Sequence, residues 1–159
     1  MSEVTESAAA TQAPTVYDAA GGADAMRRLA EAWHARCLAD PIAEHPFSHG
    51  THPQHTERLA AYWGEMLGGP HAFTSGLGTE AGIVRMHSCN GPHPELDTAA
   101  ECCFVHALDD ARIPDEEPLR TNLIDWFRWS SALVTYGFQT DQVTDDLRLP
   151  RWSWSGPVD

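Results

Sequence analysis

Nine histidines occur in a chain of 159 residues, and histidine is the side chain best suited to bind a metal or move a proton near neutral pH. One of them, His87, lies in the stretch 78–93, which reads GTEAGIVRMHSCNGPH. Residues three and four apart share one helix face, so His87 is expected to point with Ile83 and Val84 into an apolar interior. An imidazole there is either an iron ligand or a core side chain bonded to a backbone carbonyl. We take the ligand as the working hypothesis for His87.

Two more histidines, His34 and His55, lie at helical spacing from apolar residues. His34 follows Ala30 by four residues at the edge of an apolar stripe, and His55 shares a face with Leu59 and Tyr62. A neutral imidazole donates one hydrogen bond and accepts another, and it can take up a proton and return it. The two residues are therefore candidates for catalysis or ligand binding, with packing at the core edge as the alternative.

Four cysteines offer a different chemistry, but their spacing argues against disulfides. No two are separated in the C-x-x-C pattern, and the adjacent pair Cys102–Cys103 has poor disulfide geometry. We expect reduced thiols, mostly buried, that pack as small hydrophobic side chains. A zinc site is the alternative from another class of protein, with ligands from the set His87, Cys89, His93 and Cys102 or Cys103, although this spacing matches no common zinc pattern.

The net charge of −13 argues against partners that require a positive surface, such as nucleic acids and anionic membranes. The chain length corresponds to one domain with a substantial core. No apolar run approaches the roughly 20 residues of a membrane-spanning helix, and the first residues lack the pattern of a signal peptide. We therefore expect a cytoplasmic protein, as a monomer or a homodimer.

The candidate residues must be positioned by helices, because apolar residues recur at helical spacing along most of the chain. We expect helices over approximately residues 23–40, 52–67, 81–88, 98–111 and 119–138. Thr51 is the expected N-cap of the second helix, and Gly68-Gly69-Pro70 is expected to end it abruptly. No β-type alternation extends beyond a few residues, so the predicted fold class is all-α.

Three regions are expected from the distribution of polar and apolar residues. Residues 1–15 are mostly small and polar and predict a disordered N-terminal tail, residues 16–140 form the folded domain, and residues 141–159 form a C-terminal extension. The extension carries Trp152 and Trp154, which are expected to dock on the body of the protein or on a partner.

Several short motifs resemble those of the truncated haemoglobins, small globins whose two-over-two helical sandwich encloses haem. The motifs are the opening Tyr17-Asp18-Ala19-Ala20-Gly21-Gly22, the triplet Glu57-Arg58-Leu59 and the stop Gly68-Gly69-Pro70. Group II of that family is the most similar, and the resemblance covers roughly residues 16–138. It implies an all-α truncated globin that holds haem b.

The resemblance assigns roles to the histidines described above. The proximal haem ligand falls on His87, one residue further from the Gly-Gly-Pro stop than is common in group II, and His93 between two prolines is the competing position. On the distal side, His34 stands where the family usually has tyrosine, and His55 occupies the distal position of the next helix. The aromatic side chain that wedges against haem between these helices corresponds to Phe47.

Further positions are implied to contact the cofactor, although each of them is also an ordinary core or surface residue in any helical fold. Phe104 corresponds to a tryptophan of group II, and its smaller ring is expected to leave the distal pocket more open. Arg58, Arg85 and His71 are candidates to pair with the haem propionates. The implied apolar contacts are Phe47, Leu59, Tyr62, Phe104 and Trp126.

The implied function is the binding of O₂ or another diatomic ligand, CO or NO, at a histidine-ligated iron, with oxygen transport as the corresponding role. A distal N–H donor stabilises bound O₂ by about 1–2 kcal/mol, or roughly tenfold in affinity. Because histidines stand at both distal positions, peroxidase-like or NO/O₂ redox chemistry is also expected. Such a redox role would require a reductase as partner. A globin-fold sensor or scaffold without haem is the remaining alternative.

Overall fold

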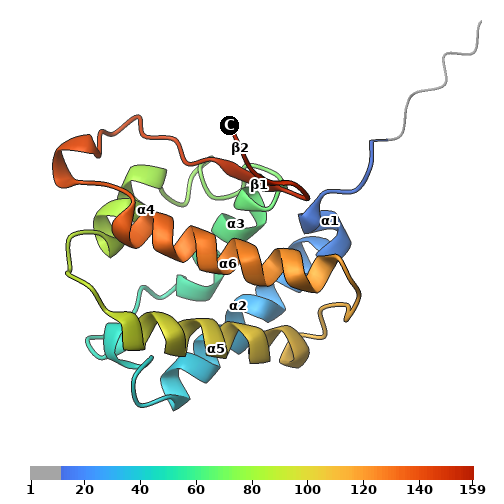
Figure 1. Cartoon of the computed structure of the whole chain (residues 1–159), viewed down its shortest axis with the longest axis horizontal. Coiled ribbons are helices and arrows are strands. Elements are labelled where there is room, and N and C mark those ends of the chain that lie inside the picture. Colours follow the sequence, from blue (N-terminus) through green and yellow to red (C-terminus); the bar gives the residue numbers. More distant parts are fainter. Residues whose placement is uncertain (1–11) are drawn as a thin grey trace, which may run out of the picture.

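The computed structural model describes residues 12–159, which form mainly helices (Figure 1). The α-helices of this part are α1 (Val16–Ala20), α2 (Gly22–Ala39), α3 (His55–Met66), α4 (Glu80–His87), α5 (Pro94–Asp110) and α6 (Leu119–Tyr136). Its remaining elements are the 3₁₀ turns η1 (His45–Phe47) and η2 (Thr140–Gln142) and the strands β1 (Arg151–Ser153) and β2 (Gly156–Val158). The predicted all-α class is thus confirmed. Residues 1–11 of the predicted disordered tail lie outside the described residues.

A glycine separates the first two helices at the opening motif of the chain. The Thr15 hydroxyl accepts a hydrogen bond from the Asp18 N–H at 3.1 Å, and the Asp18 carboxylate accepts one from the Thr15 N–H at 3.0 Å, so α1 begins with a capping box. Gly21 follows α1 with a φ of +117°, and a Cβ there would lie 2.9 Å from that of Ala25. The sharp turn from α1 into α2 therefore depends on glycine.

Helix α2 is the element against which most of the others are placed. It packs along both α3 and α5, α5 packs beside α6, and α1 and α4 both contact α6. Figure 1 shows α5 and α6 side by side, with α4 towards one end of the molecule and α1 towards the other. Among the helices of residues 12–159, none combines the length and the hydropathy that a membrane span requires.

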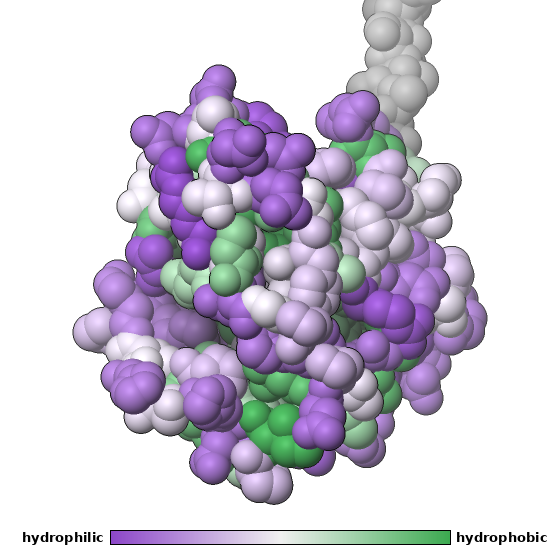
Figure 2. Space-filling model, turned by 60° about the vertical axis from the view of Figure 1, so that its left-hand side comes forward, coloured by the Kyte–Doolittle hydropathy of each residue, from purple (hydrophilic) through white to green (hydrophobic). Residues whose placement is uncertain are grey.

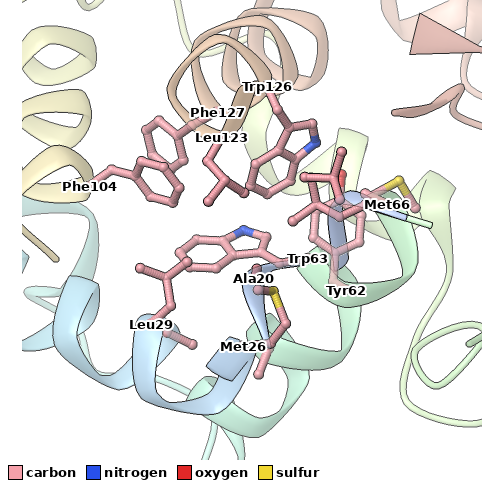
Figure 3. Close-up of a cluster of buried hydrophobic side chains, with 14 of the residues drawn as sticks. Ala20, Met26, Leu29, Tyr62, Trp63, Met66, Phe104, Leu123, Trp126 and Phe127 are labelled. Atoms are coloured by element: carbon pink, nitrogen blue, oxygen red, sulfur yellow. The ribbon is translucent and has the colours of Figure 1, made fainter. Parts of the chain in front are cut away.

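Trp63 of α3 lies at the centre of the main core (Figure 3). Its ring packs edge to face against four others, with centroid distances of 5.5 Å to Trp33, 5.6 Å to Phe104, 6.0 Å to Trp126 and 6.1 Å to Phe127. Phe104 also stacks on Phe127 at 4.1 Å with 16° between the ring planes. Each aromatic pair of this kind contributes about 0.5–1.5 kcal/mol beyond the area that it buries. These contacts join α2, α3, α5 and α6 in one core.

Two helices begin at residues other than those predicted. Helix α3 begins at His55 rather than directly after Thr51, because His52 precedes a proline and its ring Nδ1 accepts the Gln54 N–H at 3.0 Å. Helix α5 begins earlier than predicted, at Pro94, since proline suits the first position of a helix. In both cases local chemistry near a proline sets the boundary.

The C-terminal residues pack on the body of the protein and end in an antiparallel hairpin, which the sequence did not lead us to expect. Leu149 and Trp152 are buried in the main core. The indole N–H of Trp152 donates to Asn122 Oδ1 at 3.3 Å, and that of Trp154 donates to the Pro14 carbonyl at 2.9 Å. The extension therefore docks on its own domain, which was one of the two expectations.

Candidate functional site

His87 is the last residue of α4, and its side chain is exposed. The predicted orientation into an apolar interior is therefore wrong. The buried apolar face of α4 consists of Ala81 and Val84, and the helix ends at Ser88, where the backbone becomes extended. Because the helix stops one turn after Val84, the imidazole lies at the edge of the core rather than inside it.

The His87 ring nevertheless has a fixed hydrogen-bond partner. Its Nδ1 lies 2.8 Å from the carbonyl oxygen of Ile83, one turn earlier on α4. A carbonyl oxygen only accepts, so Nδ1 carries a proton, and in the neutral ring Nε2 is the nitrogen with the lone pair. Histidines that ligate metals usually have this arrangement, with one ring nitrogen bonded to a carbonyl and the other directed to the metal.

His34, His55 and Phe47 form an aromatic cluster where α2, η1 and α3 meet. The ring centroids of the two histidines are 4.8 Å apart, and Phe47 lies 4.9 Å from His34 and 5.6 Å from His55. Nδ1 of His34 and Nε2 of His55 are buried and have no hydrogen-bond partner in the described part of the chain. The predicted grouping of these three residues is therefore present in the structure.

Both histidines of this cluster favour the neutral state. Burial lowers the pKa of His34 below its ordinary value of 6.5. Burial also lowers the pKa of His55, and the nearby groups His34, Arg58 and His52 lower it further. At neutral pH each ring thus keeps one N–H donor and one free lone pair, which is the state that both donates to a ligand and accepts a proton.

Phe47 is held in the cluster by the turn that follows α2. The Asp40 carboxylate accepts the backbone N–H groups of Ile42 and Ala43, both at 2.8 Å, which folds the chain back on itself after the helix. Ala43 is buried beside Cys37, and the Phe47 ring packs against the same small group. The turn therefore brings the predicted aromatic wedge next to His34.

The other predicted haem contacts lie in the main core. Phe104, with its smaller ring, does not leave that region open, because the aromatic rings around Trp63 fill it (Figure 3). The Tyr62 hydroxyl, beside Ser130, and the Trp126 indole N–H are buried without a hydrogen bond of normal geometry. Burial raises the pKa of Tyr62 to about 12, so the phenol stays protonated. Leu59 is partly buried at the edge of the same core.

Two tryptophans connect this core to the histidine cluster. Trp33 lies 6.0 Å from Phe47 and 5.5 Å from Trp63 between ring centroids, and its indole N–H donates to the Ala100 carbonyl at 3.0 Å. Sequence reasoning did not single out Trp63. Its spacing of four residues from Leu59 was the available signal, since that spacing puts both on one helix face.

The predicted propionate partners differ in what they contact. The Arg85 guanidinium pairs with the Asp145 carboxylate at 2.8 Å, and the His71 ring lies 3.1 Å from the Glu65 carboxylate. The Arg58 guanidinium lies 6.0 Å from the centroid of the Phe73 ring.

The structure does not assemble the alternative zinc site. Cys89 contacts the Thr140 hydroxyl at 3.1 Å, whereas Cys103 is buried with Cys37 and Cys102 is exposed. Within residues 12–159, no three His, Cys, Asp or Glu side chains are arranged to hold a metal ion. The expectation of mostly buried thiols holds for two cysteines, since Cys89 and Cys102 are exposed.

Among the hollows on the surface of residues 12–159 are two that His34, His55 and His87 do not line. One, of about 490 Å³, lies between the end of α2 and the start of α5 and contains His45 and His93, the competing ligand position. The other, of about 260 Å³, lies between the start of α2 and α3, beside Tyr17 and Glu57. Figure 2 shows one side of the molecule, where hydrophilic side chains surround small areas of apolar surface.

Comparisons with known proteins were made for the sequence and for the fold. The family described as bacterial-like globin matches residues 15–129. No curated protein sequence shows significant similarity to the chain. The structure is similar to that of a haemoglobin from the thermophilic phototrophic bacterium Chloroflexus aurantiacus, with 25% identity and a TM-score of 0.63, over 77% of this chain and 98% of that one.

Two further solved structures show the same fold at lower identity. The group II truncated haemoglobin of Bacillus anthracis is 17% identical, with a TM-score of 0.65 over 79% of this chain and 93% of that one. A thermostable haemoglobin from Thermobifida fusca is 22% identical, with a TM-score of 0.62 over 76% and 96% of the two chains.

Proposed function

The chain belongs to the bacterial-like globin family, and on that premise we propose that it binds haem b through His87 and uses it to hold small diatomic ligands. The resemblance to truncated haemoglobins inferred from short motifs is confirmed by the family match and by the shared fold. O₂, CO and NO are the proposed ligands.

The hydrogen bond from His87 Nδ1 to the Ile83 carbonyl is the observation that carries the proposal. It leaves Nε2 as the free donor atom, on a ring that is accessible at the end of α4. Iron in haem accepts an imidazole nitrogen as its axial ligand. The hydrogen bond therefore supports His87 as the axial ligand, because it directs Nε2 rather than Nδ1 away from the backbone of α4.

The distal side of the proposed site is the cluster of His34, His55 and Phe47. A buried polar atom without a partner costs about 1–3 kcal/mol, so the unpaired His34 Nδ1 and His55 Nε2 favour a polar ligand beside them. Haem iron, when bound, supplies the coordination position at which a diatomic ligand is held. The N–H of one distal histidine would donate a hydrogen bond to that ligand.

Other residues are proposed to contact the haem macrocycle and its propionates. We propose that Phe47 and the partly buried Leu59 provide the apolar surface against the macrocycle, and that Tyr62, Phe104 and Trp126 belong to the core that supports it. Arg58 and Arg85 are proposed to face its propionates, and for Arg85 this would compete with its ion pair to Asp145.

Peroxidase-type turnover is a second candidate function, and the contact between two neutral imidazoles favours it. Cleavage of a peroxide needs a base that takes the proton from one oxygen and then returns it to the departing oxygen. His34 and His55 both have lowered pKa values, so either ring is free to accept that proton at neutral pH. The electrons would come from a small reducing substrate or a reductase.

The absorption spectrum of the purified protein tests the main proposal. Protein produced with an adequate supply of haem should show a Soret band and equimolar haem, and CO should shift the band of the ferrous form. A colourless protein that stays colourless when haem is added contradicts the proposal. Equimolar zinc in such a protein supports the metal-site alternative, and its absence supports a scaffold without cofactor.

A further inference from the structure

Two buried glutamates and one arginine join the C-terminal segment to the helix that carries His87. Glu65 of α3 is 1% exposed and Glu80 of α4 is 3% exposed. The Arg151 guanidinium of β1 lies between them: Nη2 is 3.0 Å from Glu65 Oε1, and Nη1 donates to Glu80 Oε1. One cation thus bridges two buried carboxylates from two helices.

Each of the two carboxylates also accepts hydrogen bonds from groups other than Arg151. Glu65 accepts the N–H groups of Phe73 and Thr74 at 3.1 and 3.0 Å and the Thr74 hydroxyl at 2.6 Å. Glu80 accepts the Leu149 N–H at 3.0 Å. Burial alone would raise the pKa of Glu65, but the hydrogen bonds from Thr74 and His71 and the charge of Arg151 outweigh it and lower the pKa.

The ion pair of Glu80 with Arg151 holds the helix that carries His87, because Glu80 and His87 are the first and last residues of α4. A helix of two turns has few contacts of its own, and in α4 the buried apolar side chains are Ala81 and Val84. The C-terminal segment also contacts the second turn, since Arg85 donates to the Val143 carbonyl at 3.2 Å. In Figure 1 this segment runs from the end of α6 past α4 to β1.

We propose that Arg151 is a positioning residue for haem binding: by pairing with Glu80 it fixes α4, and through α4 the His87 ring. Residues 143–151 then act as a strap over the proximal helix. The strap lies beyond residues 15–129, the part that matches the family. The role in haem binding rests on the proposed function, whereas the effect on α4 does not.

Arginine suits this position better than lysine would. Its planar guanidinium presents several N–H donors in a fixed fork, so two of its nitrogens can engage two carboxylates at once. A lysine ammonium is a compact charge on a flexible stem and would pair closely with one of Glu65 and Glu80. The substitution Arg151→Lys is therefore expected to rescue the strap only in part.

Hydrogen exchange of the protein without haem tests the strap directly. In Arg151→Met, the amides of residues 83–88 should exchange faster by about tenfold or more, while those of α2 and α5 stay within about twofold of the wild type. The matched control is Arg148→Met, because Arg148 also contacts Glu80, at 3.3 Å, but its side chain is 78% exposed. In this control, the amide exchange rates of every helix should stay within about twofold of the wild type.

Unchanged exchange of α4 in Arg151→Met overturns the proposal, and so does an equal acceleration of every helix, which would mean general destabilisation. If Arg151→Met does not fold, Glu80→Gln replaces it, because the amide keeps the shape of the side chain and an acceptor for the Leu149 N–H. Glu80→Gln should likewise accelerate exchange of residues 83–88 and leave that of α2 and α5 within about twofold of the wild type.

A spectroscopic measurement tests the link to His87. The iron–histidine stretching band of the ferrous protein should shift or broaden in Arg151→Met, less so in Arg151→Lys, and should be unchanged in Arg148→Met. Faster exchange of α4 with an unchanged band overturns the positioning role. A wild type that takes up no haem contradicts the proposed function instead, and the two failures are distinguishable because exchange is measured without haem.

Discussion

The imidazole rings of His34 and His55 lie 4.8 Å apart between centroids, one on α2 and the other on α3. Two charged imidazoles at this distance would repel each other, and the charge of His34 is one of the causes that lower the pKa of His55. The pair is therefore held in the folded protein in its neutral form.

The first prediction is that this pair makes stability depend on pH in mildly acidic solution. In the unfolded chain both histidines titrate near 6.5, whereas in the folded protein they titrate lower. As the pH falls below 6.5, the unfolded state binds more protons than the folded state does. The contribution of these two histidines to the free energy of unfolding is therefore fully present above that pH and is lost below it. Denaturant unfolding at about pH 7.5 and about pH 5.5 measures the difference.

The control for this prediction is His55→Gln, which removes one titrating ring and keeps a polar side chain. The variant should lose less of its unfolding free energy between the two pH values than the wild type does. Glu65 does not interfere, because its pKa is lowered from 4.5 and its contribution is lost only at lower pH. Equal losses in both proteins would contradict the assignment to His55.

A second prediction concerns the four thiols. Cys89 and Cys102 are exposed, whereas Cys37 and Cys103 are buried together and burial raises the pKa of both. A thiol reagent should therefore label Cys89 and Cys102 rapidly in the native protein, and Cys37 and Cys103 only after denaturation. Mass spectrometry of labelled peptides identifies the sites. Rapid native labelling of Cys37 would contradict the packing of α2 on α5.

A third prediction follows from the position of Phe104. Its side chain is fully buried and stacks on Phe127, so the larger ring in Phe104→Trp has no free space. We expect a loss of about 1–3 kcal/mol in the free energy of unfolding. Leu38→Trp is the control, since Leu38 is 48% exposed and tolerates a larger side chain. A stable Phe104→Trp protein would instead indicate the open pocket that the sequence suggested.

Helical spacing was sufficient to predict the all-α class, because a helix buries one face and that face can be recognised from residues three and four apart, whereas the globin fold was predicted from the family resemblance. The predicted bounds of α2, α4 and α6 agree with the structure to within two residues. The starts of α3 and α5 were missed because they depend on the His52 ring and on Pro94, which act locally and leave no trace in the apolar pattern.

The site was harder to predict, because it depends on contacts between residues far apart in the chain. The family resemblance implied that His34, His55 and Phe47 face one site, and their rings are in contact because α2 packs on α3. The exposure of His87 depends on where α4 ends, which spacing alone does not give. The pair Glu65–Arg151 joins residues 86 positions apart, and a sequence pattern does not contain such a contact.

A fourth prediction distinguishes the two candidate proximal ligands. His87→Ala should lose the five-coordinate ferrous spectrum, because α4 carries no other histidine to replace it, and added imidazole should restore part of it. His93→Ala should keep that spectrum, since His93 lies in the loop before α5 and lines the surface hollow. The opposite result, with His93→Ala defective and His87→Ala normal, would move the ligand to His93.

The last prediction tests whether the distal histidines act on peroxide. We expect turnover of peroxide with a small reducing substrate, and a rate that falls as the pH drops below 6.5 through the lowered pKa of the acting histidine, because protonation removes the base. Ferric wild type, His34→Ala and His55→Ala are titrated with peroxide while their absorption spectra are recorded.

Three results of that titration have different meanings. A high-spin wild type whose peroxide reaction is lost in His34→Ala or His55→Ala supports proton transfer by that ring. A low-spin wild type that becomes high-spin and faster in His55→Ala means that His55 itself coordinates the iron, which contradicts the catalytic role. If both variants react as the wild type does, the two rings take no part in the reaction. Their unpaired nitrogens, His34 Nδ1 and His55 Nε2, would then serve ligand binding alone, and the effect of each variant on O₂ dissociation would measure it.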